Sequence, residues 1–268
     1  MAEIEHDEVE SSRAPLMDHL IELRQRLLLV IAFLTVGFIG CFLISGLLYE
    51  WLLAPYSQAA SLVRGVPVEE LELTANFFAP LEFFFVKLKL SLVGAIMVTF
   101  PVIAWQVYGF VQPGLYKNER GAFAPFLALS PILFAAGVSF VYFLVLPMVM
   151  RFSLGQEQAS AGPGISIELL LNVSDYMNLI TTLMLVFGIS FQMPILMMLL
   201  AKAGIINSKQ MLGSWRFAVV GIALFAAFVT PPDPISQIML GSALLLLFFI
   251  SVGLMRWMEP KATEVDET

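Results

Sequence analysis

Charged residues are scarce in this chain of 268 residues, since Asp, Glu, Lys and Arg make up only 13% of it. Soluble globular domains carry about 25%. Hydrophobic residues make up 59% of the chain, so the composition excludes a water-soluble fold. The formal net charge of -7 arises mainly from acidic residues in 1–10 and 259–268, which leaves the part between them nearly neutral.

Cysteine and histidine are almost absent. Cys41 is the single cysteine and lies in an apolar stretch, which excludes an internal disulfide and a cysteine-based metal site. His6 and His19 are the only histidines, so chemistry that needs a histidine pair within the membrane is excluded as well. No nucleophile–base pair is evident, and we expect neither an enzyme, such as a membrane protease, nor a cofactor or metal.

Long apolar stretches dominate what is present. A membrane-spanning helix takes about 20 residues, and stretches near this length predict six spans, at 27–48, 83–111, 123–149, 176–201, 216–230 and 235–256. The last two are separated by Thr230-Pro-Pro-Asp-Pro234, where three prolines cannot continue a helix and a tight turn is expected. We therefore predict an all-α polytopic membrane protein whose fifth span is short.

An even number of spans places both termini on one side of the membrane. Segments on that side carry most of the basic residues: Arg13, Arg24, Arg26, Lys117, Arg120, Lys202, Lys209, Arg216, Arg256 and Lys261. The other side has Arg64 and Arg151, and the positive-inside rule therefore places both termini in the cytoplasm. Lys87 and Lys89 lie near the outer end of the second span and are expected to extend outward.

We expect one membrane domain at 15–256, between a flexible acidic tail at 1–14 and an acidic tail at 257–268. The long outer loops, at about 49–82 and 150–175, are expected to cap the bundle. Few ionisable residues lie near the middle of the spans, where Gln192 is the main polar group. A small-solute or ion transporter would need more such groups, and the chain shows none of the internal repeats of many transporters.

The segment before the first span predicts an amphipathic helix at the cytoplasmic interface. Pro15 suits the first helical position, and leucines follow at helical spacing, at positions 16, 20, 23 and 27. Asp18, Glu22 and Arg26 share the opposite face. Two interpretations of Glu22 stay open, an ion pair with Arg26 one turn later or a contact for a ligand.

A second carboxylate follows the second span. Pro113 and Gly114 end that span, and Glu119 then lies between Lys117 and Arg120 before the third. Glu119 either interacts favourably with the N-terminal end of the third span or binds a ligand. Two interfacial carboxylates beside a membrane bundle suit a ligand with guanidinium groups, because Arg–carboxylate pairs form bidentate hydrogen bonds.

Four segments resemble the signature segments of the TatC family, the multispanning subunit of the twin-arginine protein translocase. They are His19-Leu-Ile-Glu-Leu-Arg-Gln-Arg26, Pro113-Gly-Leu-Tyr-Lys-Asn-Glu-Arg120, Ser190-Phe-Gln-Met-Pro194 and Thr230-Pro-Pro-Asp-Pro-Ile-Ser-Gln237, in the family's order and at its spacing. The resemblance extends from about residue 15 to 256. It implies a concave six-helix bundle in a bacterial-type inner membrane.

The resemblance also implies a function without catalysis. The chain would bind twin-arginine signal peptides of folded cargo at its cytoplasmic face and support export driven by the protonmotive force. Its partners would be TatA-type and TatB-type single-span proteins, membrane lipid and further copies in a higher oligomer, with no nucleic acid.

By the same resemblance, Glu22 and Glu119 receive the two arginines of the signal peptide. The surrounding cytoplasmic surface would be completed by Leu23, Phe110, Pro113, Lys117 and Arg120. Arg24 would either orient this site or contact a phospholipid phosphate.

Gln192 lies about nine residues before the cytoplasmic end of the fourth span, roughly 14 Å deep. A polar side chain at this depth usually finds a partner inside the protein. Gln192 either satisfies backbone groups freed by Pro194 or, as the resemblance implies, meets the single-span partners.

Outer-side candidates surround the proline-rich turn of Pro231, Pro232, Asp233 and Gln237. Asp233 either caps the sixth span or contacts a partner, since the resemblance implies that the fifth span and this turn dock the TatB-type helix. Phe225 and Phe228 are either partner contacts or ordinary lipid-facing or core residues. Pro55 matches a family position in the first outer loop, and its simpler interpretation is a helix stop.

Overall fold

The computed structural model describes residues 2–71, 74–111, 120–159, 169–202, 204–230 and 234–258. Its helices, in chain order, are α1 (Ala2–Leu43), α2 (Ser45–Arg64), the 3-10 turn η1 (Val68–Glu70), α3 (Glu82–Val111), α4 (Arg120–Phe140), the π-helical turn η3 (Val141–Val145), α5 (Leu146–Ala159), α6 (Val173–Ser190), α7 (Met193–Lys202), α8 (Ser208–Gly213), α9 (Trp215–Val229) and α10 (Pro234–Met258). The short strands β1 (Ala75–Asn76) and β2 (Leu171–Asn172) pair in parallel.

Helix α1 joins two elements that the sequence predicted to be separate. The expected interfacial helix and the first span form one helix that also includes the segment expected to be an acidic tail. Pro15 therefore lies inside the helix rather than at its start, because a proline leaves one helical hydrogen bond unmade without having to end the helix. Good helix formers such as Leu, Glu and Arg then continue without interruption into the apolar stretch. The first span ends at Leu43, earlier than expected.

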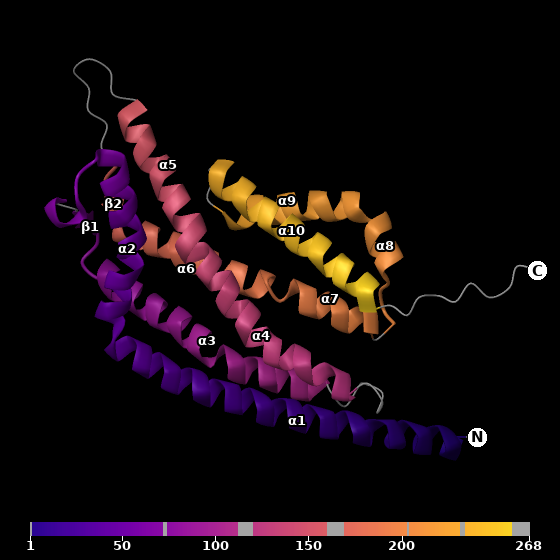
Figure 1. The fold of residues 1–268 in the computed structure, drawn as a ribbon. Helices are drawn as coiled ribbons and strands as arrows, with labels where there is room; N and C mark the ends of the chain where they lie inside the picture. Colours follow the sequence, from indigo (N-terminus) through magenta and orange to yellow (C-terminus); the bar gives the residue numbers. More distant parts are fainter. Residues whose placement is uncertain are drawn as a thin grey trace, which may run out of the picture.

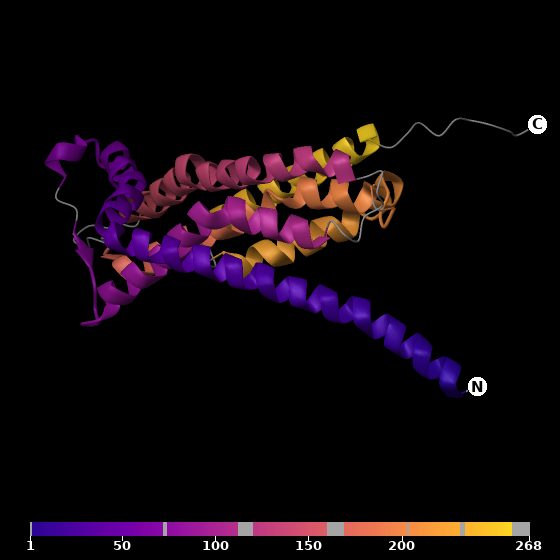
Figure 2. The same ribbon diagram turned by 90° about the horizontal axis from the view of Figure 1, so that it is seen from below.

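Six apolar helical segments were expected, and the described part of the chain contains five that are long enough to cross a membrane together with the shorter α9. The third and fourth spans are composite: α4, η3 and α5 form one continuous run, and α6 and α7 are separated by the turn at 191–192. The start of α1 and the end of α10 lie at the same end of the molecule (Figures 1 and 2). We call this the terminus end.

The described parts of the expected outer loops are largely helical. Helix α2 occupies much of the first, and α5 extends the third span to Ala159, into the second. These two helices pack together at the end opposite the terminus end, next to the β1–β2 pair (Figure 1). Arg64 of α2 also bridges to Glu157 of α5, with 3.2 Å between Nη2 and Oε1.

Pro55 does not stop a helix, which corrects the simpler interpretation of this residue. It is buried inside α2 and, lacking an N–H, cannot bond the carbonyl of Trp51 one turn earlier. The Tyr142 hydroxyl donates to that carbonyl at 2.9 Å, and the Tyr176 hydroxyl donates to the neighbouring carbonyl of Leu52 at 2.9 Å. Side chains from the long composite spans thus supply hydrogen bonds where α2 contains its proline.

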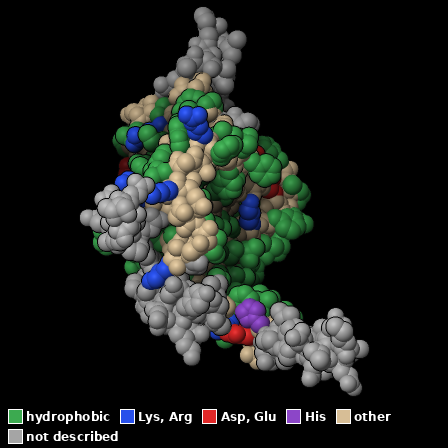
Figure 3. Space-filling model, turned by 90° about the vertical axis from the view of Figure 1, so that its right-hand side faces the viewer, with side chains coloured by type: hydrophobic (Ala, Val, Ile, Leu, Met, Phe, Trp, Pro, Cys, Tyr) green, Lys and Arg blue, Asp and Glu red, His purple; other side chains and the backbone are tan. Residues whose placement is uncertain are grey.

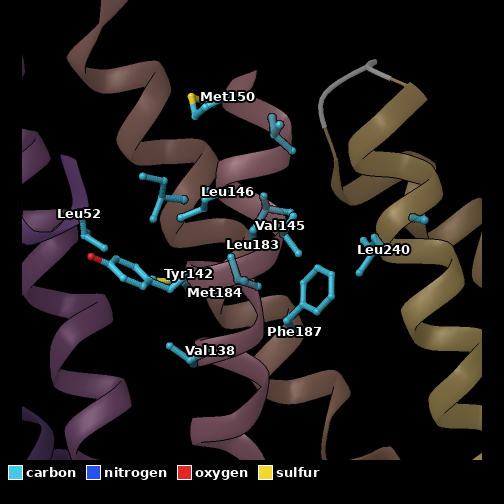
Figure 4. Packing of buried hydrophobic residues seen from close by; sticks show 14 of the residues in the cluster. Leu52, Val138, Tyr142, Val145, Leu146, Met150, Leu183, Met184, Phe187 and Leu240 are labelled. Atoms are coloured by element: carbon cyan, nitrogen blue, oxygen red, sulfur yellow. The ribbon is translucent and has the colours of Figure 1, made fainter. Parts of the chain in front are cut away.

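The core lies where η3 and α5 meet α2 and α6, with α10 adding a further layer (Figure 4). Phe187 and Leu146 are fully buried there. Helices α4 and α6 cross closely at Gly137, where a Cβ would lie 2.7 Å from the carbonyl oxygen of Phe187. Large apolar side chains elsewhere face outward along α1, α9 and α10, as expected for a protein whose solvent is lipid.

Lys89 is exposed and bonds to a neighbouring span. Its Nζ donates to Oδ1 of Asn178 in α6 at 2.5 Å. Lys87 lies over the ring of Phe83, 4.9 Å from the centroid. Both ammonium groups remain near the N-terminal end of α3, opposite the terminus end.

Candidate functional site

The candidate site lies at the terminus end, where α1 runs beside the last turns of α3 (Figures 1 and 2). Lys and Arg side chains are spread over this end, while a histidine lies next to acidic side chains at its edge (Figure 3). The described acidic and histidine side chains of α1 are those of Glu22 and His19. They lie one helical turn apart, so they share one face of α1.

Glu22 forms the ion pair that the simpler interpretation predicted. Arg26 donates to Oε1 of Glu22 through Nε at 3.0 Å and through Nη2 at 2.6 Å. The side chain of Glu22 is 35% exposed and that of Arg26 is 26% exposed. The pair is therefore open to solvent and to a ligand.

Arg26 extends this pair across to α3. Its Nη1 donates to Oε1 of Gln106 at 3.2 Å. Gly109 follows Gln106 by one turn and leaves the room that the guanidinium occupies, because a Cβ there would lie 2.1 Å from Nη1 of Arg26. The local structure thus fixes a guanidinium between a carboxylate on α1 and an amide on α3.

Phe110 is brought into the same site through His19. The two rings stack with centroids 4.3 Å apart and an interplanar angle of 19°. Leu23 and Arg24 are exposed on α1, beside Glu22 in sequence. The structure therefore groups Glu22 and Phe110, with Leu23 and Arg24 adjoining on the surface of α1.

The other predicted residues of this surface are not placed. Pro113, Lys117 and Glu119 lie outside the described residues, and Arg120 begins α4 with its side chain also outside them. The pairing of Glu22 with Glu119 consequently stays a prediction from the sequence.

Gln192 finds its partner inside the protein, as its depth predicted. It lies in the turn between α6 and α7 and donates through Nε2 to the carbonyl of Ser130 in α4 at 2.9 Å. The Ser130 hydroxyl donates to Oε1 of Gln192 at 2.7 Å. The amide thus links two spans, rather than serving only the backbone beside Pro194 in its own helix.

The outer-side candidates do not converge on one site in the described part of the chain. Pro231, Pro232 and Asp233 lie outside it, and Gln237 is half-buried in the first turn of α10. Phe228 is 91% exposed and Phe225 is 46% exposed on α9, which agrees with a lipid-facing position or with a surface open to a partner helix. Pro55 belongs to the packing of α2.

Three contributors to the candidate site were not assigned roles from the sequence. His19 begins the first signature segment, and its position one turn before Glu22 was a usable signal. Gln106 and Gly109 carried no signal, since a glutamine and a glycine near a helix end have many common roles. Only the crossing of α1 and α3 brings them to Arg26.

Comparison with known proteins identifies the family. Residues 18–242 match the model of the family described as Sec-independent protein translocase protein (TatC). A relative of that name from Magnetococcus marinus is 34% identical over 95% of this chain and 88% of its own length. One from Campylobacter jejuni is also 34% identical, over 94% of this chain and 98% of its own.

A solved structure confirms the fold. The crystal structure of a twin arginine translocase receptor, TatC, superposes with a TM-score of 0.74 at 33% identity, covering 89% of this chain and 98% of that one. The family match and the helical membrane fold therefore agree, and this chain belongs to the TatC family of Sec-independent protein translocase proteins.

Proposed function

We propose that this protein is the receptor and core scaffold of a twin-arginine translocase, and that it binds the signal peptides of folded cargo at the terminus end. The observation that carries the proposal is that Glu22, a partly exposed carboxylate, already binds the guanidinium of Arg26. The chain shares its fold with a twin arginine translocase receptor. The chemistry needed is arginine recognition at a membrane surface, without catalysis.

The surroundings of Glu22 suit such a peptide. The apolar side chain of Leu23 and the stacked rings of His19 and Phe110 offer contact area beside the carboxylate, and aromatic and apolar groups stabilise a bound arginine through its stem and its planar head. In this proposal Glu119 binds the second arginine, and Pro113, Lys117 and Arg120 complete the surface.

The proposal also assigns sides and partners. The terminus end faces the cytoplasm of a bacterial-type inner membrane, because the described helix ends there carry more basic residues than the opposite end. A TatB-type single-span protein would dock at the exposed apolar surface of α9 and the adjoining turn, and TatA-type proteins are the other expected partners. Gln192 is a second candidate contact, and further copies and lipid complete the assembly that the protonmotive force drives.

Binding of a fluorescent twin-arginine peptide to the full-length protein in nanodiscs tests the proposal. Glu22→Gln should weaken binding about 10- to 100-fold, since hydrogen bonds to charged groups contribute about 1.5–3 kcal/mol. Glu119→Gln should weaken it similarly. Glu50→Gln is the matched control, because Glu50 is an exposed carboxylate on α2 at the opposite end. Unchanged binding by both Glu22→Gln and Glu119→Gln would remove the proposed site.

A further inference from the structure

Arg26 occupies Glu22 in the way that a ligand's arginine would. Its guanidinium lies within hydrogen-bond distance of the carboxylate on α1 and of the Gln106 amide on α3. Gly109 provides the space for the group against α3. The protein thus carries one arginine of its own where a peptide arginine would bind.

An arginine can pair with one oxygen of a carboxylate or with both. The Glu22–Arg26 pair uses a single oxygen, which is the weaker of these two geometries. Both donors, Nε and Nη2, reach the same oxygen, Oε1. A guanidinium on a separate chain is free to address both carboxylate oxygens through parallel hydrogen bonds, the arrangement in which such pairs are strongest. A lysine ammonium cannot reproduce that fork.

If a peptide arginine displaced Arg26 from Glu22, Arg26 would still have a hydrogen-bond partner. Its Nη1 already bonds Oε1 of Gln106 at 3.2 Å, and the side chain is 26% exposed. The released guanidinium therefore keeps an acceptor on α3 as well as contact with water. The cost of exchanging one arginine for another at Glu22 is then small, as for partly exposed ion pairs in general.

We propose that Arg26 is a built-in competitor at the Glu22 site, which an incoming peptide arginine must displace, so that Arg26 lowers the affinity of every peptide that binds through Glu22. This inference rests on the proposed function and adds a residue that sets the affinity of the same site. The alternative role for Arg26 is to hold Glu22 in position for the peptide. The two roles predict opposite effects of removing Arg26.

Removing the competitor should strengthen binding. In the nanodisc assay, Arg26→Gln should bind the twin-arginine peptide roughly two- to fivefold more tightly, the factor by which partly exposed ion pairs shift equilibria. The same factor should apply to a peptide in which both arginines are lysines, because an internal competitor lowers the fraction of open Glu22 sites equally for every ligand. Arg256→Gln is the matched control, because it removes an exposed arginine from the last turn of α10 at the same end.

Gly109→Ala provides a second variant that keeps every charge. The new Cβ would fall 2.1 Å from Nη1 and 2.9 Å from Nη2 of Arg26, so the flexible guanidinium has to leave its place while the backbone stays. Binding should again tighten, by a smaller factor than in Arg26→Gln. Tighter binding in both variants, with no change in Arg256→Gln, supports the competitor role.

The Glu22→Gln background separates this inference from the proposed function. With no carboxylate to compete for, Arg26→Gln should have no further effect there. If Glu22→Gln weakens binding but Arg26→Gln and Gly109→Ala bind as the wild type or more weakly, the competitor role is wrong and the receptor role stands. If Arg26→Gln tightens binding equally with and without the Glu22 carboxylate, general charge is responsible and the inference is also wrong. If Glu22→Gln binds as the wild type, Glu22 is not a peptide contact and both ideas fail at this residue.

Discussion

The hydrogen bond from Tyr142 to the carbonyl of Trp51 should stabilise the packing of α2 because Pro55 leaves that carbonyl without its helical donor. The bond is 2.9 Å long, and the two rings also stack with centroids 4.1 Å apart. Tyr142→Phe removes the hydroxyl while keeping the ring. We expect a loss of about 1–2 kcal/mol in the free energy of unfolding, the range for a partly buried carbonyl left unpaired and for hydrogen bonds between membrane helices.

A second substitution makes this reasoning specific. Pro55→Ala restores an N–H that can bond the Trp51 carbonyl within α2, so Tyr142→Phe should cost only a few tenths of a kcal/mol in that background. Tyr176→Phe is the control. Its hydroxyl bonds the carbonyl of Leu52, whose helical donor would come from Tyr56 rather than from residue 55, so Pro55→Ala should not rescue it.

Unfolding of the purified protein by SDS in mixed micelles, followed by circular dichroism, measures these differences as a double-mutant cycle. The cycle gives the coupling free energy between positions 55 and 142. We expect Tyr142→Phe to cost less free energy of unfolding when residue 55 is alanine. Equal costs of Tyr142→Phe with and without Pro55 would refute the claim that the tyrosine replaces the missing donor. A similar rescue of Tyr176→Phe would show that Pro55→Ala stabilises α2 in some general way.

Two further changes test contacts between spans in the same assay. Ser130→Ala should cost about 1 kcal/mol, because the Oε1 of Gln192 loses a donor inside the bundle; an unchanged transition would mean that this bond does not hold α4 to the turn between α6 and α7. Gly137→Ala should cost more than about 2 kcal/mol, since its Cβ would meet the backbone of Phe187 and the helices would have to separate. Gly40→Ala, in a helix with open space around the new Cβ, should be neutral or slightly stabilising, and equal effects of the two glycine changes would contradict the close crossing.

Motifs that depend on local sequence were predicted well, and those that depend on helix crossings were not. The ion pair of Glu22 and Arg26 follows from a separation of four residues on one helix, which needs no knowledge of the fold. Pro55 shows the opposite case. A proline in an isolated helix suggests a break, and only the approach of Tyr142 and Tyr176 from distant segments explains why α2 continues through it.

The sequence by itself determined the class of protein, the six apolar helical segments and the family, because burial in lipid requires long uncharged stretches and the signature segments are contiguous. The sequence also showed that Glu22 and Arg26 lie on one face of a helix. Only the tertiary structure decided what Arg26 does with its remaining donors. Gln106 and Gly109 lie 80 or more residues away in sequence, and they form a place for the guanidinium only because α3 packs against α1 at the terminus end.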